Sequence, residues 1–126
     1  MKKKLPKISD SEWRVMRVLW EKGAQTANDV VQALSDEVEW NPRTIKTLIS
    51  RLVKKGAVKA TDEGSRYRYR AAVDESDCVR SETRKFLRRV YKGAMTPALA
   101  AFLEDAELSA REIDELQKIL DKKRGD

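Results

Sequence analysis

Apolar residues recur at helical spacing in the first third of the chain. Ser9 and Glu12 have the spacing of a capping box, and Gly23 stands where a helix would end. Between them the apolar positions lie three or four residues apart, at Trp13, Met16, Leu19 and Trp20. A second, shorter apolar segment begins after Thr26 and ends in the acidic stretch 35–39. The pattern predicts two consecutive amphipathic helices.

A third helix is delimited at both ends. Asn41 is a favourable N-cap, Pro42 suits the first helical position, and Gly56 follows the last periodic residue. One side is apolar, with Ile45, Leu48, Ile49 and Leu52. The remaining arc is polar, and no acidic residue occurs between positions 43 and 56. The sequence therefore predicts a helix with one buried and one strongly basic face.

After Gly56 the spacing of apolar and polar residues changes from helical to alternating. Residues 57–61 are typical of a short strand and residues 62–64 of a tight turn. In residues 65–70 arginine occupies every second position, with serine or tyrosine between. We expect the arginines on the outer face, and we expect Tyr67 and Tyr69 to pack against the helices. The order helix, helix, helix, hairpin is that of a winged helix-turn-helix.

The second half of the chain is predicted to be helical throughout. A long helix covers residues 74–92, a short apolar one starts at Thr96, and a capping box at Ser109 and Glu112 opens the last. The fold class is thus mainly α with a small β-hairpin wing. We predict a winged-helix DNA-binding domain over residues 1–73 and a three-helix dimerisation domain over residues 74–126.

The net charge of +6 is concentrated in the first half. Lys and Arg outnumber Asp and Glu by 16 to 9 in residues 1–73, whereas the counts are 11 and 12 in residues 74–126. A basic domain joined to a neutral one is typical of a module that binds a polyanion. Lys2, Lys3 and Lys4 are either an arm that contacts phosphates or a frayed, solubilising terminus.

Several function classes are excluded by the residue inventory. The chain has no histidine and a single cysteine, Cys78, so a His/Cys metal site, a histidine general base and an intrachain disulfide are not expected. We expect no cofactor, no catalytic activity, and a buried structural role for Cys78. No apolar window approaches about 20 residues and no signal peptide is present, so we expect a cytoplasmic protein.

The polar arc of the third helix and the hairpin carry the candidate DNA contacts. Arginine or lysine near the start of a recognition helix can donate to guanine, and threonine methyls can contact thymine. The candidates are Asn41, Arg43, Thr44, Lys46, Thr47, Ser50, Arg51, Lys54, Arg66 and Arg68. Two alternatives stay open, namely a non-specific nucleic-acid-binding protein and a helical adaptor whose basic half is incidental.

The apolar residues of the last three helices are the candidate dimer contacts. Short amphipathic helices do not close a core alone, and a second copy of the same module is the simplest surface that could cover them. The candidates are Phe86, Leu87, Val90, Tyr91, Leu99, Phe102, Leu103, Ile113, Leu116, Ile119 and Leu120. The alternative is that these helices pack back on the first domain of a monomer.

Several segments resemble the penicillinase-repressor and methicillin-resistance-regulator (BlaI/MecI) family. They are residues 40–48 (WNPRTIKTL), 51–56 (RLVKKG), 74–77 (DESD), 86–93 and 108–116. The resemblance implies a dimer that binds palindromic operators and represses β-lactam resistance genes. It also implies that Arg43, Thr44, Lys46 and Thr47 match the base-reading stretch.

The same resemblance implies a release mechanism. Members of the family are cleaved in the dimerisation domain when a membrane-bound sensor protease detects the antibiotic. The matching bond is Ala101–Phe102. The best-known members have Asn where this chain has Ala101, so a repressor of the same family with a different inducer is the alternative.

Overall fold

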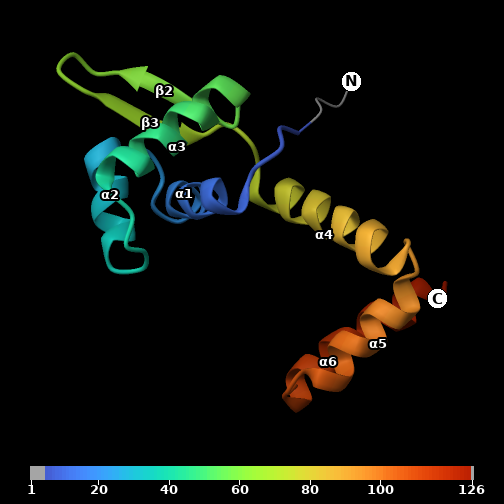
Figure 1. Ribbon diagram of the computed structural model, residues 1–126. Helices are drawn as coiled ribbons and strands as arrows, with labels where there is room; N and C mark the ends of the chain where they lie inside the picture. Colours follow the sequence, from blue (N-terminus) through green and yellow to red (C-terminus); the bar gives the residue numbers. More distant parts are fainter. Residues whose placement is uncertain (1–4, 126) are drawn as a thin grey trace. The chain divides into compact units, whose positions relative to one another are not determined.

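The computed structural model describes residues 5–125, and Lys2, Lys3 and Lys4 lie outside them. The described chain forms six helices and three short strands (Figure 1). In chain order these are α1 Asp10–Lys22, β1 Gln25–Thr26, α2 Ala27–Ser35, α3 Pro42–Lys55, β2 Val58–Asp62, β3 Tyr67–Ala71, α4 Glu75–Tyr91, α5 Met95–Asp105 and α6 Ala110–Lys123. The mainly helical fold class with a small wing is confirmed.

The chain divides into two compact units, one through Glu82 and the other from Thr83. The division falls inside α4, whereas the sequence pattern predicted it before that helix, between residues 73 and 74. The first part of α4 thus belongs with the N-terminal unit. Its contribution is Cys78, which is 3% exposed and joins the core of that unit.

The helices of the N-terminal unit begin where their side chains can cap them. Ser9 Oγ accepts a hydrogen bond from the Glu12 backbone N–H, and Glu12 Oε1 accepts one from the Ser9 N–H at 2.8 Å. Thr26 and Asp29 form the same reciprocal box at the start of α2. Each box satisfies two of the backbone N–H groups that a helix start leaves without partners.

Three helices and a small sheet surround one apolar core in the N-terminal unit. Its most buried side chains include Val15, Met16, Leu19, Val30, Leu34, Ile45, Ile49 and Leu52. Trp13 and Trp20 are partly buried against this core in an edge-to-face pair, with ring centroids 5.5 Å apart. The Trp20 indole N–H donates to the Val73 carbonyl at 3.0 Å, which ties α1 to the segment before α4.

The sheet has three antiparallel strands in the order β1-β3-β2. The predicted hairpin is present, but its strands lie one or two residues further along the chain than the sequence pattern predicted. Strand β1 was not predicted, because two residues are too few to show a period. It pairs Gln25 with Tyr69 and Thr26 with Arg68, so the N-cap of α2 lies beside the wing.

The C-terminal unit buries few of its apolar side chains. Leu87 and Ala98 are the buried hydrophobic residues among its described positions. The exposed ones are Val90, Met95, Leu99, Phe102, Leu103, Ile113, Leu116, Ile119 and Leu120. The predicted capping box at Ser109 is present, whereas α5 begins at Met95 without a side-chain cap. No helix in residues 5–125 is long and apolar enough to span a membrane.

Candidate nucleic-acid interface

Capping residues delimit helix α3 at both ends, and one apolar stripe packs it against the core. Asn41 Oδ1 accepts the Arg43 backbone N–H at 2.8 Å, and Pro42 occupies the first helical position. At the other end Gly56 adopts φ 83°, and its N–H bonds back to the last turn. This left-handed conformation suits glycine and closes the helix. The predicted limits of the helix are confirmed.

Every candidate contact residue on α3 is exposed. These residues are Asn41, Arg43, Thr44, Lys46, Thr47, Ser50, Arg51 and Lys54. Thr47 Oγ1 donates to the Arg43 carbonyl oxygen at 2.9 Å, so its hydroxyl is used within the helix. Its methyl group remains available for an apolar contact, such as one with the methyl group of thymine.

Lys55 lies just beyond this basic face and has a different role. Its Nζ lies 2.5 Å from Glu12 Oε1 and donates to the Lys7 carbonyl oxygen at 2.9 Å. Glu12 is 1% exposed. Burial raises the pKa of Glu12, but the hydrogen bonds from Lys55 and Ser9 outweigh it and hold that pKa below its usual value. The ion pair fixes the end of α3 against the start of α1, and the sequence pattern did not reveal it.

The wing joins α3 in lining one groove. The groove is lined by residues 26–29 of α2 and its cap, by Lys46, and by Ser65, Arg66, Tyr67 and Tyr69. Lys46 and the exposed Arg66 thus share a groove although they are 20 positions apart. Tyr69 packs against the core as predicted. The prediction for Tyr67 was wrong, because its side chain is 52% exposed at the end of the hairpin, beyond the reach of the core.

Arg68 is only partly exposed and has an acidic partner. Its Nε lies 2.9 Å from Glu63 Oε1 across the turn of the hairpin. The Thr26 backbone and side-chain hydrogen bonds, and then the nearby charges of Arg68 and Arg66, hold the pKa of Asp29 below its usual value. Arg68 therefore has one carboxylate partner, Glu63, and its charge also acts on Asp29.

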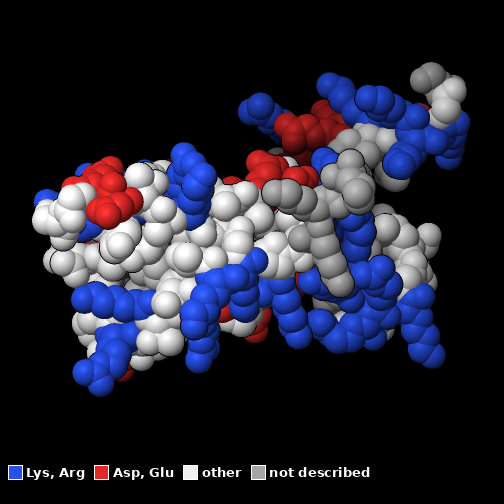
Figure 2. Space-filling view, turned by 90° about the horizontal axis from the view of Figure 1, so that it is seen from above, with Lys and Arg blue, Asp and Glu red and all other residues white. Residues whose placement is uncertain are grey.

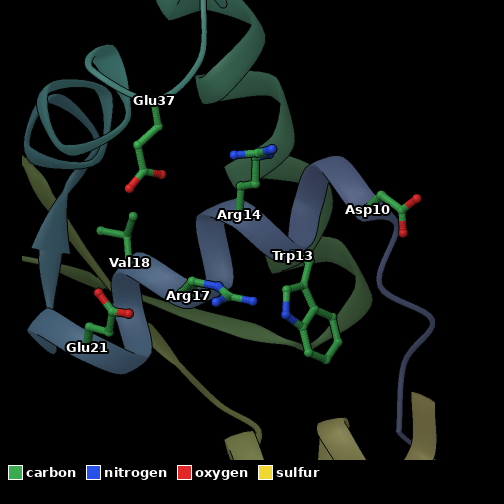
Figure 3. Close-up of a pocket in the computed structure, with 7 residues that line it drawn as sticks. All are labelled: Asp10, Trp13, Arg14, Arg17, Val18, Glu21 and Glu37. Carbon is green, nitrogen blue, oxygen red and sulfur yellow. The ribbon is translucent and has the colours of Figure 1, made fainter. Parts of the chain in front are cut away.

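The outer face of α1 provides a comparison within the same unit. Figure 3 shows Arg14 and Arg17 interleaved with Asp10, Glu21 and Glu37. These residues line an open groove of about 730 Å³. Figure 2 shows Lys and Arg side chains over much of one face, with Asp and Glu in a few separate clusters. The polar arc of α3 contains no acidic residue. A polyanion is repelled by interleaved carboxylates and attracted by an acid-free surface. The charge distribution therefore favours α3 over α1.

Comparison with known proteins supports the nucleic-acid interface independently of the charge distribution. Residues 8–122 match the family model described as penicillinase repressor. The chain is 41% identical to the penicillinase repressor of Bacillus licheniformis over 119 residues, covering 94% of this chain and 93% of the relative. It is 37% identical to the methicillin resistance regulatory protein MecI of Staphylococcus aureus strain N315, covering 98% and 100%.

Two solved structures resemble the N-terminal part. The solution structure of the DNA-binding domain of the repressor BlaI has 43% identity and a TM-score of 0.54, covering 60% of this chain and 93% of that one. The monomeric form of Bacillus licheniformis BlaI in complex with the blaP half-operator has 43% identity and a TM-score of 0.53 over the same shares.

Proposed function

The chain belongs to the penicillinase repressor family, and from this premise we propose that it acts as a homodimeric transcriptional repressor on palindromic operators. The target genes we propose are those of β-lactam resistance, which the family controls. The observation that carries the proposal is the exposed, acid-free face of α3. The half-operator complex of a relative with 43% identity supports DNA as the ligand.

We place α3 in the major groove, with its N-terminal residues at the base edges. Arg43 and Lys46 donate to guanine O6 and N7, and the Thr44 and Thr47 methyls contact thymine. Arg51 and Lys54 lie one to two turns later and bind phosphates, as do Asn41 and Ser50. The wing adds Arg66 and Arg68 on the flanking backbone. The shared groove of Lys46 and Arg66 supports this arrangement.

The dimer contact is assigned to the C-terminal unit. Its eight exposed large apolar residues on α5 and α6 would remain in water in a single chain. Covering them with the same unit of a second chain removes that surface from water, at about 25 cal/mol per Å². Phe86, Val90 and Tyr91 of α4 extend the contact, whereas Leu87 is already buried within the chain. A twofold dimer sets two copies of α3 at a fixed spacing, which matches a palindrome.

Release is assigned to proteolysis of the Ala101–Phe102 bond in α5 by a membrane-bound sensor protease. Phe102 is 52% exposed, and its ring stacks on that of Phe86 with centroids 6.1 Å apart. Cutting the chain here would remove the end of α5 and all of α6 from the dimer contact. Loss of the dimer weakens binding, because each half-site then acts alone.

The family is one of transcriptional repressors, and we propose that this chain likewise acts by occupying DNA, without catalysis or cofactor. A repressor of this kind acts in the cytoplasm, where its operators lie. The alternative of non-specific binding makes a distinct prediction, because it depends on phosphates alone and shows little preference among sequences.

Selection from a random duplex library tests the proposal. We expect repeated rounds with the full chain to enrich a palindrome with half-sites about one helical turn apart. In mobility-shift assays the enriched duplex should bind at least about a thousandfold more tightly than a scrambled duplex of equal composition. Equal binding of the two duplexes would contradict sequence-specific repression and favour the non-specific alternative.

A further inference from the structure

One arginine of the wing has a carboxylate partner within the chain. The Arg68 Nε donates to Glu63 Oε1 at 2.9 Å, and the two side chains are 41% and 44% exposed. The backbone holds Glu63 in place, because its N–H donates to the Arg66 carbonyl oxygen at 2.8 Å. Asp62 Oδ1 closes the same turn by accepting the Gly64 N–H at 2.9 Å. A fixed turn therefore presents the Glu63 carboxylate to Arg68.

The charge of Arg68 also acts on a second carboxylate. The register of the sheet places Arg68 opposite Thr26, the N-cap residue of α2. Asp29 completes that cap, and the charges of Arg68 and Arg66 act on it. Arg68 thus lies opposite the start of α2, and its chain neighbours Tyr67 and Tyr69 line the groove that Lys46 and Arg66 share.

A phosphodiester and a carboxylate bind a guanidinium in the same way. Both present anionic oxygens to its N–H groups in short, charge-assisted hydrogen bonds. The bond to Glu63 uses the Nε–H of Arg68, so a phosphate that approaches this edge of the guanidinium must displace Glu63. A phosphate that approaches the remaining N–H groups is repelled by the nearby carboxylate. An exposed ion pair is weak and can be displaced at low cost. The cost still reduces the affinity of every complex in which Arg68 contacts DNA.

We propose that Glu63 competes with the DNA phosphates for Arg68 and thereby lowers the affinity of this protein for duplex DNA. The inference rests on the proposed DNA-binding function. In this proposal Glu63 acts through Arg68 and does not itself touch DNA. Removal of Glu63 should therefore strengthen DNA binding, whereas removal of Arg68 should weaken it.

The experiment compares E63Q with D62N in the full chain. Both substitutions remove one negative charge from the same turn, but only E63Q weakens the bond to Arg68, because a neutral amide oxygen is a poorer acceptor than a carboxylate. In D62N the amide oxygen of the new side chain can still accept the Gly64 N–H. The probe is a fluorescein-labelled duplex of mixed sequence, about two helical turns long, titrated by anisotropy at about 50 mM salt. We expect E63Q to bind about three- to fivefold more tightly than D62N, equivalent to about 0.7–1 kcal/mol.

A double-mutant cycle separates competition from a general effect of charge. R68Q alone should weaken binding. In the R68Q background, E63Q should bind no more tightly than D62N, because there is no guanidinium left to release. The midpoints of thermal unfolding of all variants should agree within a few degrees, since the pair is exposed. The Arg68 Nε–H resonance of labelled protein should shift in E63Q and again on adding the duplex.

The outcomes are distinguishable from those for the proposed function. If the unsubstituted chain fails to bind the duplex at low salt, the proposed function itself is wrong. If it binds, but E63Q binds no more tightly than D62N, the competition is overturned. Weaker binding by E63Q would overturn it too, because Glu63 would then orient Arg68 for its contact with DNA.

Discussion

The two units of this chain differ in how far they bury their apolar side chains. In the N-terminal unit Met16 and Leu52 are completely buried, and the helices and sheet of a single chain cover them. In the C-terminal unit Phe102 is 52% and Ile119 58% exposed. Monomers rarely expose large contiguous apolar patches, so this difference supports the proposal that a partner surface covers the C-terminal unit.

A motif common to both units shows the same difference. Ser9 with Glu12 and Ser109 with Glu112 are identical capping boxes. Glu12 is buried and also binds Lys55, so its box holds two helices together. Glu112 is exposed, and its box serves its own helix. Local sequence therefore sets the cap, and the surroundings decide whether the cap has a tertiary role.

The largest expected effect comes from a cavity in the N-terminal unit. Leu52→Ala should lower the free energy of unfolding by about 2–5 kcal/mol, because the removed methyl groups leave a hole in a closed core. Urea unfolding followed by circular dichroism at low protein concentration measures this. Leu120→Ala, at a 55% exposed position, is the control and should cost little under those conditions. Equal losses would mean that the two units are packed alike.

A charge on α6 should break the dimer while leaving the N-terminal unit folded. Ile119→Asp should raise the dimer dissociation constant about a hundredfold or more, because each buried carboxylate costs about 1–3 kcal/mol and a twofold interface buries two. Sedimentation equilibrium measures the constant. Lys118→Asp, on the side of the helix opposite its apolar stripe, is the matched control. A monomeric unsubstituted chain at micromolar concentration would contradict the assignment of this surface.

Two basic residues of α3 should carry sequence recognition. Arg43→Ala and Lys46→Ala should each weaken binding to the selected operator by about 1–3 kcal/mol and leave the thermal midpoint unchanged, because both side chains are exposed. Arg14→Ala and Arg17→Ala remove the same charge from the groove of α1 and should have little effect. A protein–protein adaptor with an incidental basic half would show no difference between the two pairs.

The smallest expected effect is on the pH dependence of stability, to which the two capping boxes should contribute differently. The pKa of Glu12 is lower in the folded chain than its usual value near 4.5, so its contribution to stability is complete above that value. The contribution is lost as the pH falls through the folded pKa. Urea unfolding between about pH 6 and pH 3 should therefore show a loss of stability that Glu12→Gln reduces.

Glu112→Gln is the matched control for this pH profile. The pKa of Glu112 is also lowered, by its hydrogen bonds to the Ser109 backbone and side chain, but its carboxylate is fully exposed. Solvent and salt screen such a group. The unfolding of the N-terminal unit should therefore keep its pH dependence in this variant. An identical flattening in both variants would contradict the distinct role of the buried Glu12–Lys55 pair.

The features that sequence predicted well are those set by neighbours along the chain. The caps at Ser9 and Asn41 and the closing Gly56 depend on contacts within a few residues, so their spacing is visible in the sequence. Strand β1 was missed because its pairing with β3 is long-range. The exposure of Tyr67 was missed because alternation tells which residues share a face, but not where the covering surface ends.

By itself the sequence determined the order of helices and hairpin, the acid-free face of α3 and the family of the chain, because these follow from period, capping chemistry and residue identity. Only the tertiary structure decided which charges meet. It joined Lys55 to Glu12 and Arg68 to Glu63, and it brought Lys46 and Arg66 into one groove. Charges interact through space, and the distances between helices and strands arise only when the chain has folded.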